Sequence, residues 1–286
     1  MQRMMATTIA CSLVLALGSA GVTAQQPSAP GGGARPDLGE IRKVSSLLDV
    51  DVLNRANEEI AGIEDLVLST DGRVLYAVLS RGGVADIGAE STAVPWEVLN
   101  VRHVNGKWAV NLDMTEEALE KAPTFQQDDY KELTNPQWVA RVHDFYRPQT
   151  AVDGQPGREP RAQALQSVVC AAKIVGANLK NAANEDIGEV KDLLLDRTGR
   201  MAFAILGHGG TLGIGESFVP VPWSKLRLNY NREDTAITVQ IPVTKEQLEK
   251  APLVKEDTYA TLLAPGFVDQ VYRYFGMNGP EPGTGR

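Results

Sequence analysis

The sequence predicts a mainly β protein with short helices, organised as two tandem small antiparallel β-barrels that are each followed by capped helices. Three observations carry this prediction. A domain-sized segment occurs twice, apolar runs lie between turn signals in each occurrence, and each occurrence ends in a stretch with helical spacing. At about 150 residues per domain, a chain of 286 residues is long enough for two domains with an apolar core each.

The composition is that of an ordinary globular protein. With 43% hydrophobic residues, 22% charged residues and 2 Cys, it excludes a collagen-like, disulfide-framed or wholly disordered chain. The net charge of -8 argues against the clustered Lys and Arg through which proteins bind the phosphate backbone. We therefore expect no nucleic-acid partner.

The first 24 residues have the order of a secretory signal peptide. Arg3 precedes an apolar run over residues 11–17, and small residues end at Ala24. The run is shorter than the roughly 20 apolar residues that cross a bilayer. The alternative is a buried N-terminal helix, but glycines follow at 31–33 and no core-type pattern continues. We expect cleavage after Ala24 and a periplasmic or secreted protein with no transmembrane segment in the mature chain.

Cleavage would leave Cys170 as the only thiol, which excludes an internal disulfide. We expect Cys170 to be a small buried apolar residue, with an intermolecular bridge as the alternative. Residues 25–40, rich in Pro and Gly, are expected to be a flexible linker ahead of the first domain.

The repeat is found by sliding the chain against itself by 127 residues. After the turn at Asn105-Gly106 the offset becomes 129, because the second copy has a longer turn there, and a hairpin turn tolerates such an insertion. The copies span residues 41–147 and 166–276, joined by a linker at 148–165 and followed by a flexible tail at 277–286. The matches include Asn54 with Asn181, Asp65-Leu66 with Asp192-Leu193, Gly72-Arg73 with Gly199-Arg200, and Val94-Pro95-Trp96 with Val221-Pro222-Trp223.

Each copy starts with a predicted hairpin. In the first copy residues 63–69 and 74–80 flank Asp71-Gly72, which supplies the positive φ of a tight turn. The second strand is apolar on both sides, as is its counterpart at 201–206, so we expect it to be covered on both faces.

Shorter strands and helices follow. Residues 93–94 and 99–101 lead to a strand with strict alternation at 108–112. Thr115 and Thr244 begin capped helices that Pro123 and Pro252 are expected to stop. A last aromatic stretch has spacings of three and four, which predicts a short helix that packs on a barrel, either its own or that of the other copy. This stretch includes Trp138, Val142 and Tyr146 in the first copy and Phe267, Val271 and Phe275 in the second.

The ordered motifs of both copies resemble a known family. They are Gly62-Ile63-Glu64-Asp65-Leu66, Asp71-Gly72-Arg73, Ile87-Gly88 and Val94-Pro95-Trp96, with Ile187-Gly188-Glu189-Val190-Lys191-Asp192, Thr198-Gly199-Arg200, Gly213-Ile214-Gly215 and Val221-Pro222-Trp223. Over more than half of the chain, this string is similar to the PRC-barrel domain, named for the cytoplasmic domain of the photosynthetic reaction-centre H subunit and shared by a ribosome-maturation factor. The resemblance implies a strongly bent β-barrel that acts as an interaction module, usually without catalysis, and it carries no catalytic set. A secretory leader is unlike both named relatives.

Candidate contact residues are the glycine loops with Gly83, Ile87, Gly210 and Ile214, the strand-ending Trp96 and Trp223, and the terminal aromatics Trp138 and Phe267. As phosphate cradles the loops lack the Lys-Ser/Thr of a P-loop, so we expect strand connections with the isoleucines in the core. An exposed Trp would mark a contact surface, whereas a buried one would cover the mouth of a barrel.

Asp65 and Asp192 recur just before Leu-rich strands and are the candidate functional acids. They either accept hydrogen bonds from backbone N–H groups or serve as ligand or proton groups. His103, His143 and His208 are the only histidines and lack ligand spacing, so no metal site is expected, and no cofactor motif is found.

The duplication repeats a scaffold and no catalytic constellation, so we expect no catalytic residues and a non-enzymatic protein-interaction or assembly module, whose partner is another protein or a second copy of the chain. The alternative is a small-ligand binding protein that uses a cleft between the barrels. An enzyme built by one copy alone is third.

Overall fold

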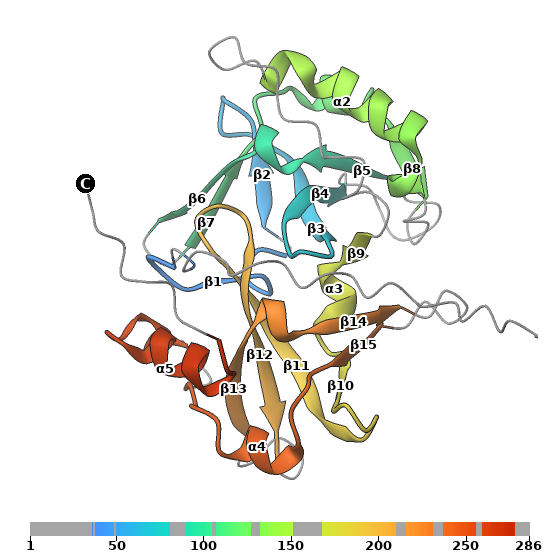
Figure 1. Ribbon diagram of the computed structural model, residues 1–286. Helices are drawn as coiled ribbons and strands as arrows, with labels where there is room; N and C mark the ends of the chain where they lie inside the picture. Colours follow the sequence, from blue (N-terminus) through green and yellow to red (C-terminus); the bar gives the residue numbers. More distant parts are fainter. Residues whose placement is uncertain are drawn as a thin grey trace, which may run out of the picture.

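The computed structural model describes residues 36, 38–48, 50–80, 90–104, 107–126, 132–150, 168–209, 216–230, 237–255 and 259–277. It is mainly β with few helices, and its strands form two sheets, one for each copy. The sheets lie one above the other in Figure 1, with the first copy at the top. The predicted β-rich class is confirmed.

The first sheet has the strand order β6-β7-β2-β3-β4-β5-β8. Its long central strands form the predicted hairpin, and the short strand β9 from the start of the second copy pairs with β3 off this path. The strands are β2 (Asp51–Leu53), β3 (Glu59–Ser69), β4 (Val74–Ser80), β5 (Glu90–Pro95), β6 (Asn100–Val104), β7 (Lys107–Asn111), β8 (Thr124–Gln126) and β9 (Val168–Cys170).

The second sheet has the order β13-β12-β11-β10-β15-β14. The short strand β1 from the start of the first copy pairs with β11, so each sheet receives one strand from the other copy. The strands are β1 (Arg42–Lys43), β10 (Asn178–Lys180), β11 (Asp186–Leu195), β12 (Met201–His208), β13 (Ser217–Pro222), β14 (Arg227–Tyr230) and β15 (Ile237–Gln240).

Two details of the sheets differ from the predicted closed antiparallel barrels. The pairs β2–β7 and β10–β15 are parallel, because the chain returns between them through several strands rather than through a hairpin. Among the described residues, the end strands of neither order pair with each other, so both sheets are open. In the first copy β8 already occupies the free edge of β5, and in the second Val254 bridges to Phe218 on β13.

The hairpin turns form as their sequence predicts. Gly72 and Gly199 have φ of 82° and 75°, which a residue without Cβ adopts at no steric cost. Every residue of β4 except the last is buried, and β12 is buried throughout, so both strands are covered on both faces.

The terminal helices α2 (Pro136–Thr150) and α5 (Phe267–Tyr274) pack on their own copies. The ring of Trp138 meets Tyr76 and Phe125 edge-on in the first copy, and Tyr272 meets Phe203 in the second. The terminal helices therefore do not exchange between copies. In Figure 1, α2 covers the outer end of the first copy.

Both capped helices begin where the sequence predicts. Thr115 caps α1 (Glu116–Leu119), and Thr244 forms a full capping box with Gln247 at α4 (Lys245–Glu249). Both helices end before the prolines that were expected to stop them. The remaining helical segments are α3 (Ala171–Ile174), η1 (Trp96–Val98), η2 (Glu132–Thr134), η3 (Trp223–Lys225) and η4 (Ala260–Leu263). Among the described helices, none has the length and apolar character needed to cross a membrane.

Candidate interaction site between the two copies

Each copy begins with a segment that crosses to the other copy. The first strap, residues 38–48, places β1 on β11, and the second strap, residues 168–175, places β9 on β3. The registers are equivalent, since Lys43 lies opposite Leu194 and Cys170 lies opposite Val67, each shifted by 127. In Figure 1, β1 and β9 lie where the two halves of the molecule meet.

The straps are held by their apolar side chains. Val44 and Leu47 of the first strap and Ala171 and Ile174 of the second are all completely buried. A fully buried Val or Leu side chain contributes about 1.5–3 kcal/mol relative to an exposed one. The straps are therefore parts of a shared core rather than loose extensions.

The two candidate acids fix the straps to the sheets. Asp192 Oδ1 accepts the backbone N–H of Ser45 at 3.2 Å, and its Oδ2 accepts the Ser45 hydroxyl at 2.6 Å. Asp65 Oδ1 accepts the backbone N–H of Ala172 at 2.9 Å, which is the equivalent contact in the opposite direction. Both aspartates are 3% exposed, and each also accepts the N–H of the leucine that follows it, at 2.7 Å for Leu66 and 2.8 Å for Leu193.

Burial raises the pKa of Asp192 above its ordinary value. The hydrogen bonds from Ser45 and Leu193 and the positive charge of Lys43 oppose this shift without cancelling it. The carboxylate is thus costly to bury and depends on the strap for its hydrogen bonds.

The hairpin turns and the tryptophans make the second reciprocal contact. Trp223 of the second copy lies against Gly72 of the first so closely that a Cβ at this glycine would overlap the indole ring. Trp96 of the first copy lies in the same way against Gly199 of the second. Trp223 is buried and Trp96 half-buried, so both predicted contact residues do touch a protein surface, namely that of the other copy.

The backbones of the two turns are also paired. The N–H of Val74 donates to Gly199 O at 2.9 Å, and the N–H of Met201 donates to Gly72 O at 2.7 Å. Between these bonds, Arg73 and Arg200 form an antiparallel bridge. They are equivalent residues of the two copies, so an approximate twofold axis passes between them.

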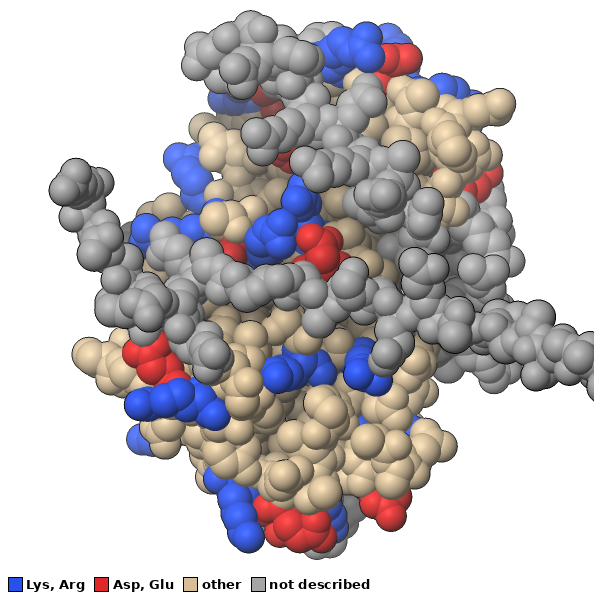
Figure 2. All heavy atoms as spheres, in the orientation of Figure 1, with Lys and Arg blue, Asp and Glu red and all other residues tan. Residues whose placement is uncertain are grey.

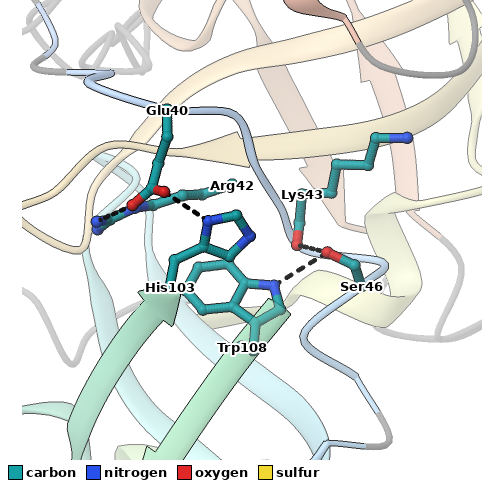
Figure 3. Close-up of polar contacts among 6 residues, drawn as sticks. All are labelled: Glu40, Arg42, Lys43, Ser46, His103 and Trp108. Carbon is teal, nitrogen blue, oxygen red and sulfur yellow. Dashed lines mark hydrogen bonds and ion pairs between the residues drawn. The ribbon is translucent and has the colours of Figure 1, made fainter. Parts of the chain in front are cut away.

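A polar cluster ties the first strap back to its own copy (Figure 3). Glu40 contacts His103 Nδ1 of β6 and the Arg42 guanidinium, both at 2.7 Å. The indole N–H of Trp108 on β7 donates to Ser46 Oγ at 3.0 Å. Arg42 lies over the Trp108 ring with its Cζ 6.0 Å from the centroid. The equivalent position of His103 in the second copy is Tyr230, so this cluster belongs to the first copy alone.

The charges of this cluster are mutually compensated. Burial alone would raise the pKa of Glu40, but hydrogen bonds and positive charge from His103 and Arg42 outweigh it and hold the pKa below its ordinary value. On the other side of the strap, Lys43 Nζ lies 4.4 Å from the ring centroid of Tyr259 in the second copy. The first strap is thus held by both copies at once.

The remaining predicted site residues are Trp138, Phe267 and four residues of the glycine loops. Trp138 is buried in the core of the first copy, and Phe267 is half-buried against that of the second. Gly83, Ile87, Gly210 and Ile214 lie outside the described residues, as does the predicted signal peptide. Within the described residues, no group of three or more His, Cys, Asp or Glu side chains has metal-binding geometry.

Sequence reasoning missed the two straps and the role of the turn glycines as contact points. A signal was available, because the offset of 127 also aligns Val44 with Ala171 and Leu47 with Ile174. Apolar residues three apart before the first long strand indicate one more buried segment per copy. The strand with which each of these segments pairs could not be identified from the local sequence pattern.

One depression of the described surface lies within the second copy. A depression of about 570 Å3 is lined only by residues 181–187 and 242–247, all of the second copy. On the face drawn in Figure 2, basic and acidic side chains of the described residues are interspersed.

The sequence model of the PRC-barrel domain matches residues 39–116 and residues 169–245. Together the matched segments cover more than half of the chain, and they include Arg42 and Lys43 of the first strap and Val169 and Cys170 of the second, which pair with the other copy. A comparison with curated proteins finds no similar sequence.

Proposed function

Because the chain belongs to the PRC-barrel domain family, in two tandem copies as its sequence predicts, we propose that it is a non-enzymatic protein-interaction or assembly module. One observation carries this proposal. The candidate functional residues that recur in both copies all lie in the contact between the two copies. They are Asp65 with Asp192 and Trp96 with Trp223. Duplication has preserved groups that hold the two copies together.

The proposal includes export. The leader with Arg3, its apolar run and Ala24 supports cleavage after Ala24 and a periplasmic or secreted location. N-terminal sequencing of the processed protein should give a chain that starts at Gln25. A chain that keeps Met1 would contradict export.

Contact with a further protein needs an exposed apolar surface beyond the copy contact. Four large hydrophobic residues are exposed among the described ones, and three of them lie in the C-terminal part of the second copy: Leu253, Leu263 and Tyr274. We propose this C-terminal part as the region that touches the partner.

Photo-crosslinking in the exporting cell tests the proposed function. A photoreactive phenylalanine analogue at Leu263 or Tyr274 should give one defined adduct with a second protein. The exposed Lys107 of β7 in the first copy is the matched control position and should give none. Absence of any defined adduct from Leu253, Leu263 and Tyr274 would overturn the proposal.

The alternative of small-ligand binding in a cleft between the copies has less support. Such a site needs polar groups that converge on a cavity. Instead, Oδ1 of both Asp65 and Asp192 accepts backbone N–H groups of a strap and of the following leucine, and Asp192 Oδ2 accepts the Ser45 hydroxyl. The depression that is described belongs to the second copy alone.

A further inference from the structure

The contact between the copies has the form of an isologous dimer interface. In such an interface, the same surface patch is presented by both partners, so that every contact occurs twice. Here three contacts occur twice, once from the first copy to the second and once from the second to the first. They are the pairing of a strap with a sheet, the hydrogen bond from a strap to an aspartate and the packing of a tryptophan on a glycine. Arg73 and Arg200 meet their own equivalents across the axis.

All of these contacts are non-covalent. The described residues resume at 168 after residue 150, and each contact named above is a hydrogen bond or packing contact between described residues of the two copies. A linker of this kind raises the effective concentration of one copy near the other to about the millimolar range, which favours pairing within one chain.

We propose that the face between the copies is a self-complementary docking surface whose partner is the complementary copy of another chain, so that copies exchange between chains whenever the link is opened. This goes beyond the proposed function, because it needs no protein other than this one. The docking surface consists of the straps, the turns at Gly72 and Gly199, Trp96 and Trp223, and the two aspartates.

The polar cluster of the first copy has a role in this exchange. It anchors Glu40 and Ser46 to β6 and β7 of their own copy, while the residues between them reach the other copy. The first strap is therefore presented in its docking conformation before the partner arrives. Such preorganisation lowers the entropic cost of binding.

Cleavage of the folded full-length chain tests the proposal. A protease site is placed between residues 151 and 165, the chain is cut after folding, and the product is examined by gel filtration and native mass spectrometry. The two halves should stay bound one to one. When cut isotope-labelled and cut unlabelled proteins are mixed, unfolded in urea and refolded together, mixed pairs should form in statistical proportion. Halves that elute separately, or refolded pairs without mixing, would overturn the proposal.

A matched pair of glycine substitutions separates docking from backbone strain. Gly72 and Gly176 both have φ of 82°, but a Cβ at Gly72 meets Trp223 whereas a Cβ at Gly176 has no atom within 4 Å. In the cut protein, Gly72→Ala should weaken binding between the halves at least tenfold, and Gly176→Ala should change it less than twofold. Equal effects of both substitutions would contradict the assignment.

A second variant keeps the test valid if Gly72→Ala impairs folding. Ser45 is exposed apart from its bonds to Asp192, so Ser45→Ala removes one contact between the copies without opening a core. It should weaken binding between the cut halves several-fold with unchanged circular dichroism of the full chain. Unchanged binding of the Ser45→Ala halves would count against docking through the strap.

Discussion

At the scale of single residues, each buried aspartate holds the strap of the other copy to its own sheet by hydrogen bonds. Asp192 is disfavoured as an ion by its burial, and the Ser45 hydroxyl and two backbone N–H groups compensate it. Asp65 makes the corresponding bonds with Leu66 and Ala172. A buried carboxylate of this kind stabilises the structure only while its donors are in place.

Loss of one aspartate should therefore be expensive. Asp192→Ala leaves the N–H groups of Ser45 and Leu193 without their acceptor and is expected to lower the free energy of unfolding by about 3 kcal/mol. Urea denaturation at neutral pH measures this. Asp186→Ala on the same strand is the control, because its carboxylate is exposed and forms a surface ion pair with Lys180, so we expect a change within about 0.5 kcal/mol. Equal losses for both would contradict the fastening role.

His208 predicts a pH dependence of stability. Burial lowers its pKa below the ordinary value, and Lys245 acts in the same direction, while Glu249 and Glu216 oppose the shift. Within the described residues, its Nε2 has no hydrogen-bond partner. The His208 imidazole is therefore protonated at a higher pH in the unfolded chain than in the folded chain. The free energy of unfolding falls as the pH drops below about 6.5.

Denaturation curves between pH 5 and pH 8 check this prediction. The wild type should lose stability below about pH 6.5 relative to His208→Gln, which cannot titrate, and the difference should level off above that pH. A difference between the two proteins that does not change with pH would contradict it.

At the scale of elements, the sequence predicts those structures that depend on neighbouring residues, but not the pairing of strands that are far apart in the chain. The hairpins and the helix starts could be predicted because an Asp-Gly turn and a Thr cap act within a few residues. The parallel pairs β2–β7 and β10–β15 could not, because they join strands far apart in the sequence. Trp96 and Trp223 were identified as contact residues, but only the assembled fold reveals that each rests on a glycine of the other copy.

The helix caps give an element-scale prediction. Thr244 Oγ1 accepts the backbone N–H of Gln247, and the backbone N–H of Thr244 donates to Gln247 Oε1, which completes a capping box. Thr115 Oγ1 accepts the backbone N–H of Ala118. Thr244→Ala and Thr115→Ala should each lower the free energy of unfolding by about 1 kcal/mol, because each removes the one side-chain oxygen that accepts the third backbone N–H of its helix. Chemical denaturation of both variants measures this, and an unchanged free energy of unfolding in either variant would contradict the capping role of that threonine.

At the scale of the whole molecule, the two copies are one structural unit. Each copy contributes a strap to the sheet of the other, and the straps carry buried residues of the common core. A copy that loses its partner also loses the acceptors and the apolar cover of its strap. The two copies thus pair in the manner of the two subunits of a dimer, and the surface through which each copy pairs is covered by the other copy of the same chain.

A disulfide across the approximate twofold axis tests this arrangement most directly. Arg73 and Arg200 are bridged with backbone bonds on either side rather than between them, a pairing that brings Cα atoms to about 4.5 Å, within the range of a disulfide. The double variant Arg73→Cys/Arg200→Cys should oxidise to an intramolecular disulfide in monomeric protein, as read by mass spectrometry of the digested chain. Free thiols under oxidising conditions, or disulfides only between chains, would contradict the reciprocal pairing of the two copies.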